Sequence, residues 1–284
     1  SSAASDVYKR QASIEANPGT VDLHKLKALQ QLGFDRISFG VQSLNDAELK
    51  AIGRVHNAAE ALEAIELAKQ AGFKRINADV IYGLPGQTMD SLKETLTRLC
   101  STGIEHLSVY GLIVEDGTPL QKMTEAGKII LPDEDEAADM YEFVQEFLKM
   151  QGFERYEISN YARGKAYSRH NLVYWHYYPY AAFGAGACGF SGSARFTAAA
   201  KVQNYIQLIQ SGGQLYDKEE LPLPVQFEEF MFMNLRKKSG VSLTEAEQRF
   251  GIDVMKKYGA EMKPYIEHNS VSYTHLTLPT TPYV

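Results

Sequence analysis

The chain has little of what marks a disulfide-bonded or membrane-spanning protein. It contains two cysteines, Cys100 and Cys188, which are far apart in the sequence and in no Cys-x-x-Cys arrangement. The sequence therefore predicts neither a disulfide framework nor a cysteine-built metal site. No apolar run approaches the roughly 18 residues that a membrane helix requires, and no signal-peptide pattern is present. These absences favour a globular protein without an integral membrane span, in a reducing compartment, and we expect it in the cytoplasm.

Positive charge is also scarce. The formal net charge is -6 at pH 7, and hydrophobic residues make up 44% of the 284 residues. A surface that binds nucleic acid needs a concentration of Lys and Arg, so we expect no nucleic-acid partner. The length and the apolar content suffice for one large α/β domain with a small additional domain.

Both ends of the chain look cut. The chain begins at Ser1 without a methionine, so we expect further residues upstream. Residues 271–284 contain no Asp, Glu, Lys or Arg, and the stretch from Val271 to Leu276 resembles one reading frame of a common sequencing-library adapter. We expect this tail to be an assembly artefact, with a natural strand or wing as the alternative.

Short β-prone runs alternate with amphipathic runs over the first half of the chain. This alternation is typical of a parallel sheet or barrel. The expected strands span 12–16, 36–41, 74–82, 104–110 and 153–159, and the expected helices span 22–32, 46–52, 58–71 and 89–102. A Gly-rich aromatic segment covers 160–198, and from about 201 the chain reads as helical, with helices at 201–211, 224–238, 243–250 and 253–266.

Cap residues support several of these helix starts. Asn45 with Glu48, and Asn57 with Glu60, have the spacing of an N-cap and its N3 partner. Pro132 is expected in the first turn of a further helix, and the four acidic residues after it complement the positive helix end. We interpret this acidic run as capping and not as a functional site.

Polar residues recur at or just after the expected strand ends. Asp79 lies on the strand that leads into a Gly-Pro-Gly turn and a helix, and Glu15, Gln42 and Arg54 occupy related positions. Each alone is more often a loop hydrogen bonder, but the carboxyl ends of parallel strands converge on one mouth. Two acids, an amide and a guanidinium at one mouth suit ribose hydroxyls and a carboxylate.

Five segments carry a resemblance to a known family. The chain resembles the radical S-adenosylmethionine (SAM) family of oxygen-independent coproporphyrinogen III oxidases over residues 12 to 270, and its HemW branch, described as haem chaperones, more than its HemN branch. The matching segments are Glu15–Gly19, Ser38–Ser43, Arg54, Asp79–Gln87 and Arg169–Trp175.

The resemblance implies an α/β fold, a partial (β/α)6 radical SAM barrel with its extension over 1–200. It also implies a small helical, winged-helix-like HemN C-terminal domain over 201–270, followed by the tail at 271–284. Acidic and basic residues are nearly balanced in the second domain, so we expect a packing or lid domain and not a nucleic-acid reader.

The resemblance also implies a cofactor site. Carried over by motif, Glu15, Gln42, Arg54 and Asp79 would contact SAM, and Gly111 would let the backbone approach it. No catalytic residue is assigned.

The Cys-x-x-x-Cys-x-x-Cys motif that holds the family's four-iron four-sulfur cluster is absent from this sequence, and so is the Gly-Gly-Gly-Thr-Pro stretch expected before Glu15. Cys100 and Cys188 do not have the spacing to replace these thiolates. We expect the motif upstream of Ser1, no metal ligand in this chain, and no reductive cleavage of SAM by the chain as given.

Three functions are open at this point. The first is a HemW-like protein that binds haem, with His170 as a ligand, and passes it to recipient proteins. His176 is the competing ligand, and His170 is otherwise a hydrogen-bonded structural residue. The second is an oxidase that decarboxylates coproporphyrinogen III to protoporphyrinogen IX. The third, a barrel enzyme for a phosphorylated metabolite, is disfavoured because no Gly-rich loop with a nearby Lys precedes a helix at the later strands.

Overall fold

The computed structural model describes residues 11–267. The chain divides into two compact units, a barrel unit that ends at Tyr167 and a C-terminal unit that begins at Ser168. This division comes earlier in the chain than the domain boundary at residue 200 expected from the sequence. The tail at 271–284 lies outside the described residues, so the adapter interpretation stays a prediction.

Alternating strands and helices build the barrel unit. Through β4, each element lies within a residue or two of its expected range. The elements are β1 (Ser13–Ala16), α2 (Leu23–Gln31), β2 (Arg36–Gln42), α3 (Asp46–Ala51), α4 (Ala58–Gln70), β3 (Arg75–Tyr82), α5 (Met89–Ser101), β4 (His106–Gly111), α6 (Pro119–Glu125), α7 (Glu134–Met150), β5 (Glu154–Arg155) and β6 (Asn160–Ala162).

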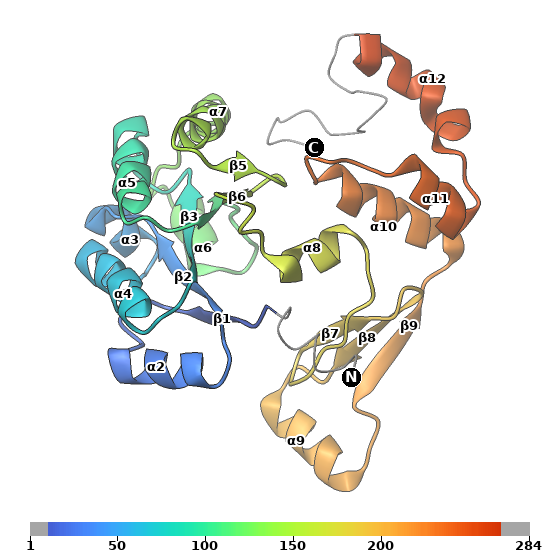
Figure 1. Ribbon diagram of the computed structural model, residues 1–284, viewed down its shortest axis with the longest axis horizontal. Helices are drawn as coiled ribbons and strands as arrows, with labels where there is room; N and C mark the ends of the chain where they lie inside the picture. Colours follow the sequence, from blue (N-terminus) through green and yellow to red (C-terminus); the bar gives the residue numbers. More distant parts are fainter. Residues whose placement is uncertain (1–10, 268–284) are drawn as a thin grey trace. The chain divides into compact units, whose positions relative to one another are not determined.

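The sheet of the barrel unit has the strand order of a β/α barrel. β1, β2, β3 and β4 are parallel neighbours in chain order. β6 pairs antiparallel with β4, and β5 pairs antiparallel with β6 at the edge of the sheet. Right-handed crossovers between sequential parallel strands place their helices on one face, and Figure 1 shows α2, α4 and α5 along one side of the sheet. The predicted α/β fold class is confirmed.

The helix-covered face of this sheet is apolar. Ile37, Phe39 and Val41 alternate along β2 and are fully buried, in one core cluster with Leu96 and Leu99 of α5. Burial of each large apolar side chain contributes about 1.5–3 kcal/mol relative to leaving it exposed. Packing of the helices onto this face therefore also determines which side chains of each strand lie on the opposite face, because successive side chains alternate between the two faces.

The opposite face carries a buried polar network. The His106 Nδ1 atom lies 2.6 Å from Asn77 Oδ1, and its Nε2 atom lies 2.8 Å from the Tyr156 hydroxyl oxygen. The Ser108 hydroxyl donates to Asn160 Oδ1 at 2.7 Å. Buried polar groups are stable only when hydrogen-bonded, and these side chains satisfy one another.

The predicted helix caps are largely confirmed. Asn57 and Glu60 form the full capping box of α4, in which each side chain accepts from the other's backbone N–H. Asn45 caps α3, but the prediction for its partner is wrong, because the Glu48 carboxylate is buried and does not accept from the Asn45 backbone.

Two predictions around α7 are also wrong. The N-cap of α7 is Asp133, whose side chain accepts from the Glu136 backbone N–H, so Pro132 precedes the helix. The strand expected over 153–159 is reduced to β5. The chain then turns back into β6, and the Tyr156 N–H donates to the Asn160 carbonyl at 3.1 Å.

The C-terminal unit contains a small antiparallel sheet that the sequence did not reveal. Its strands are ordered β7-β8-β9, and β9 occupies part of the region expected to be helical. The elements are α8 (Arg169–Trp175), β7 (Cys188–Phe190), β8 (Ala194–Ala198), α9 (Val202–Ser211), β9 (Tyr216–Glu220), α10 (Leu223–Leu235), α11 (Leu243–Phe250) and α12 (Val254–Glu267).

The last three helices of this unit surround an aromatic core. Phe227 and Phe230 of α10 are fully buried, and both pack against Phe250 of α11. This cluster is separate from the core of the barrel unit. Among the described helices, none is long and apolar enough to cross a membrane.

The polar network predicts an acid-sensitive barrel unit. Burial, followed by the nearby Arg36 guanidinium, holds the pKa of His106 well below its ordinary value of 6.5. Below that pH the unfolded chain binds a proton at this imidazole that the folded chain does not. The free energy of unfolding should therefore fall with decreasing pH, by at most about 1.4 kcal/mol per pH unit.

Urea unfolding of wild type and His106→Asn between pH 7.5 and 5.5 checks this, with hydrogen exchange at β3 and β4 reporting on the barrel unit. The substitution should remove this part of the pH dependence. Equal pH slopes in the two proteins would contradict a buried neutral imidazole.

Candidate functional site

The carboxyl ends of the parallel strands form an open pocket of about 350 Å³. Four of the five residues assigned to SAM by resemblance lie in its wall, which consists of Glu15, Gln42, Asp79, Ile81, Tyr110, Gly111, Leu112 and Ile113. The convergence follows from the parallel register, because every one of these strands ends at the same edge of the sheet.

Asp79 is the best-supported carboxylate of this pocket. The Asn77 amide donates to its Oδ1 atom at 2.7 Å, and the Ser38 hydroxyl donates to its Oδ2 atom at 3.0 Å. Burial raises the pKa of Asp79 above its usual value, and these hydrogen bonds oppose that shift. A carboxylate held by neutral donors keeps further acceptor capacity for hydroxyl groups in the pocket.

Gln42 lines the pocket with its backbone in an unfavourable conformation. Its φ of 66° lies in the left-handed region, and the β2–β3 register shifts between Gly40 and Gln42. A non-glycine residue in this region costs on the order of 1–3 kcal/mol. Such strain is typical of positions where the direction of a side chain matters more than the stability of the strand.

Arg54 lies beside the pocket and is not among the residues of its wall. Its Nη2 atom donates to Asn17 Oδ1 at 2.7 Å and to the Gly40 carbonyl at 2.6 Å. A Cβ atom on Gly40 would lie 2.8 Å from Arg54 Nη2 and 3.0 Å from Gln42 Nε2. Arg54 therefore joins the loop after β1 to the end of β2, and a side chain at position 40 would push the ends of the Arg54 and Gln42 side chains out of these positions.

The glycine at position 111 has a packing explanation. A Cβ atom there would lie 2.9 Å from the Tyr82 hydroxyl oxygen, so Tyr82 excludes a larger residue, while the backbone of Gly111 lines the pocket. Tyr110, which sequence reasoning missed, also lines it, and burial raises its pKa to about 12. The sequence did offer a signal: Tyr110 lies two residues after Ser108 on β4, so both side chains lie on the same face of the strand.

Metal ligands do not gather among residues 11–267. In that range no three His, Cys, Asp or Glu side chains are placed to hold a metal ion. Cys100 is buried and burial raises its pKa to about 11, whereas Cys188 is exposed in the other unit. The described residues do not fit the ligand set of a four-iron four-sulfur cluster, and we assign no chemistry to one.

The two histidines considered as haem ligands have different surroundings in the C-terminal unit. His170 is exposed on α8, and its Nε2 atom lies 2.8 Å from the Tyr174 hydroxyl oxygen. His176 is half-buried, with its Nδ1 atom 2.9 Å from Lys237 Nζ. Burial lowers the pKa of Lys237 to about 8, so this amine is still mostly an ammonium at neutral pH.

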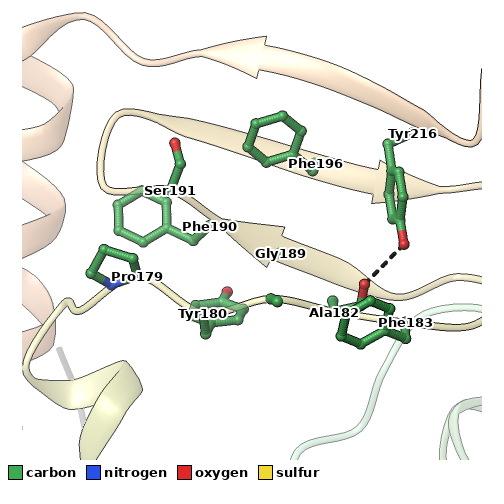
Figure 2. Close-up of a pocket in the computed structure, with 10 residues that line it drawn as sticks. Pro179, Tyr180, Ala182, Phe183, Gly189, Phe190, Ser191, Phe196 and Tyr216 are labelled. Carbon is green, nitrogen blue, oxygen red and sulfur yellow. Dashed lines mark hydrogen bonds between the residues drawn. The ribbon is translucent and has the colours of Figure 1, made fainter.

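An apolar pocket of about 500 Å³ opens in the same unit (Figure 2). Tyr216 donates across it to the Ala182 carbonyl at 3.0 Å. The ring of Tyr180 packs edge-on against Tyr174 of α8, at 4.6 Å between centroids. The lining residues are Pro179, Tyr180, Ala181, Ala182, Phe183, Gly189, Phe190, Ser191, Phe196 and Tyr216.

Two family models match the chain. The radical SAM superfamily model matches residues 4–99, and the HemN C-terminal domain model matches residues 221–272. The first match includes β1, β2 and β3 of the first pocket but ends before β4, and the second includes the last three helices of the C-terminal unit.

Curated relatives match most of the chain. It is 39% identical to the "Heme chaperone HemW" of Bacillus subtilis, covering 93% of this chain and 71% of that protein. It is 36% identical to the protein of the same name from Lactococcus lactis, again covering 93% and 71%. Among solved structures, the Escherichia coli coproporphyrinogen III oxidase HemN, described as a radical SAM enzyme, has a similar fold. The TM-score is 0.75 at 20% identity, covering 95% of this chain and 67% of that one.

The strain at Gln42 can be measured through two substitutions that both remove the amide. Gln42→Gly should have a free energy of unfolding about 1 kcal/mol higher than that of Gln42→Ala, because only glycine adopts the left-handed conformation without a steric cost. Urea unfolding of the ligand-free proteins checks this. A Gln42→Ala protein as stable as Gln42→Gly would show that the position is unstrained.

Proposed function

Because the chain belongs to the HemW family of radical SAM proteins, we propose that its barrel unit binds SAM and that its C-terminal unit binds haem for transfer to recipient proteins. The observation that carries the first part is the convergence of Glu15, Gln42 and Asp79 on one pocket. We keep a cytoplasmic location as part of the proposal, on the acidic composition and the cysteine content.

The residues of the pocket fit SAM chemically. When bound, SAM supplies a sulfonium group between an adenosine and a methionyl chain. Glu15 and Asp79 would accept hydrogen bonds from ribose hydroxyls, and Gln42 offers both a donor and an acceptor. The guanidinium of Arg54, beside the pocket, would pair with the methionyl carboxylate.

Protonation favours His170 over His176 as the haem ligand. At His176, Lys237 is the donor to Nδ1, so the imidazole proton resides on Nε2 and neither nitrogen offers a free lone pair. At His170, the tautomer that donates from Nε2 to Tyr174 presents the Nδ1 lone pair from an exposed ring. An iron ligand needs such a lone pair.

The aromatic pocket would supply apolar walls for a flat macrocycle. It is joined to His170 by the contacts of Tyr174 with both His170 and Tyr180. Phe183 is 84% exposed at this pocket, and the ammonium of Lys218 lies 5.9 Å from the centre of the Phe196 ring. Lys218 is paired with Glu220, so the support for a porphyrin here comes from the exposed apolar surface.

Coproporphyrinogen III oxidation is the alternative and has less support. The relation to HemN is one of fold at 20% identity, whereas the two HemW relatives described above match 93% of the chain at 39% and 36% identity.

Asp79→Asn should weaken SAM binding at least tenfold, because it removes a charge-assisted acceptor. The same change should not lower the stability of the ligand-free protein at pH 7, since burial disfavours the charged carboxylate. Isothermal titration calorimetry with SAM measures the first effect and urea unfolding the second. Asp90→Asn, at an exposed acid of α5, is the matched control. Wild-type affinity in Asp79→Asn would contradict the assignment.

His170→Ala should change the Soret band of the haemin complex and lower the affinity, because the iron loses its imidazole. His176→Ala should keep the wild-type spectrum. Phe196→Ala should weaken binding while leaving the position of the band unchanged. An unchanged Soret band in His170→Ala removes the proposed ligand role.

A further inference from the structure

We propose that Glu48 is a positioning residue that sets the strand ends of the SAM pocket through the turn after β3. This inference rests on the proposed SAM site and goes beyond the residues that would touch the cofactor.

The carboxylate of Glu48 is in an unusual place for its position on a helix. It is the third residue of α3, where Glu normally returns to the N-cap backbone, as Glu60 does to Asn57 at 2.8 Å in α4. At α3 the Asn45 backbone N–H instead donates to the Ser43 hydroxyl at 3.0 Å. Glu48 turns inward and is 2% exposed.

Three uncharged side chains donate hydrogen bonds to this carboxylate. Its Oε2 atom accepts from the Ser43 hydroxyl at 2.6 Å and from Gln87 Nε2 at 3.0 Å. Its Oε1 atom accepts from the Ser91 hydroxyl of α5. A buried carboxylate is costly unless it is hydrogen-bonded, so these three groups and Glu48 fix one another.

Gln87 transmits this constraint to the turn after β3. Its Oε1 atom accepts from the Gly83 backbone N–H at 2.7 Å and from that of Leu84 at 3.3 Å. Its Nε2 atom also donates to the Ile81 carbonyl at 3.2 Å. The side chain of Gln87, itself 5% exposed, therefore spans the turn and holds its first residues.

The two ends of this network adjoin the pocket. Ile81 lines the pocket, and Ser43 directly follows Gln42, which lines it from β2. Glu48 thus connects the end of β2 to the end of β3 without touching the pocket. Loss of the carboxylate would release both strand ends by a fraction of an ångström, and binding is sensitive to such shifts.

The experiment is a double-mutant cycle on SAM affinity, measured by calorimetry with SAM itself. Glu48→Ala and Gln87→Ala should each weaken binding about tenfold, and the double variant should also weaken it about tenfold, because either substitution alone breaks the Glu48–Gln87 link between the two strand ends. Glu48→Gln should stay within about threefold of wild type, because its amide oxygen can accept from Ser43 and Gln87 while Ser91 accepts from its NH2 group.

Two controls separate positioning from general stability. Glu60→Gln changes the equivalent carboxylate of α4 and should bind SAM as wild type does. Ile65→Ala removes a fully buried side chain of α4, and it should lower the free energy of unfolding without changing SAM affinity at temperatures where the protein is folded.

Wild-type affinity in Glu48→Ala overturns the proposal, and so does a double variant weakened about a hundredfold, which would mean that the two residues act independently. A wild-type protein that does not bind SAM would instead refute the proposed function. Should Glu48→Ala not fold, Ser43→Ala and Gln87→Ala take its place in the cycle, with the same two outcomes deciding.

Discussion

Side-chain alternation along β2, β3 and β4 decides most of what the barrel unit can do. One set of side chains must be apolar to pack under the helices, as Phe39 does. The other set points into an interior where water is scarce, so its polar members must bind one another. Asn77 does this most fully, through contacts with Ser38, Asp79, His106 and Ser108. The hydrogen bonds from Asn77 and Ser38 therefore fix the orientation of the Asp79 carboxylate in the pocket.

The strand ends are held by a second layer of contacts. Arg54 joins the loop after β1 to β2, and Glu48 with Gln87 joins β2 to β3. These contacts offset the strain of the left-handed backbone at Gln42. Two features of the pocket are unfavourable on their own: the buried carboxylate of Asp79 and the positive φ of Gln42. Contacts in the rest of the unit stabilise both.

Local sequence signals were sufficient for the elements through β4, because capping pairs such as Asn57 with Glu60 and the alternating patterns act within a few residues. The convergence of Glu15, Gln42 and Asp79 was also predictable, since parallel strands end at one edge. Local signals failed where the conformation of a side chain depends on a partner far away in the sequence. Glu48 has capping-box spacing but pairs with Gln87, 39 residues away.

The strand β9 was missed for a related reason. Its sequence, Tyr-Asp-Lys-Glu-Glu, has no apolar alternation, and its burial is low along the whole strand. Pairing with β8 creates it, in full register from Ala194–Glu220 to Ala198–Tyr216.

The sheet of β7, β8 and β9 matters for the proposed function, because each of the three strands contributes residues to the aromatic pocket. All of these residues, and His170, belong to the C-terminal unit, which has its own aromatic core. Haem binding as proposed therefore requires no side chain of the barrel unit. The proposed SAM site and the proposed haem site are each formed by residues of one unit.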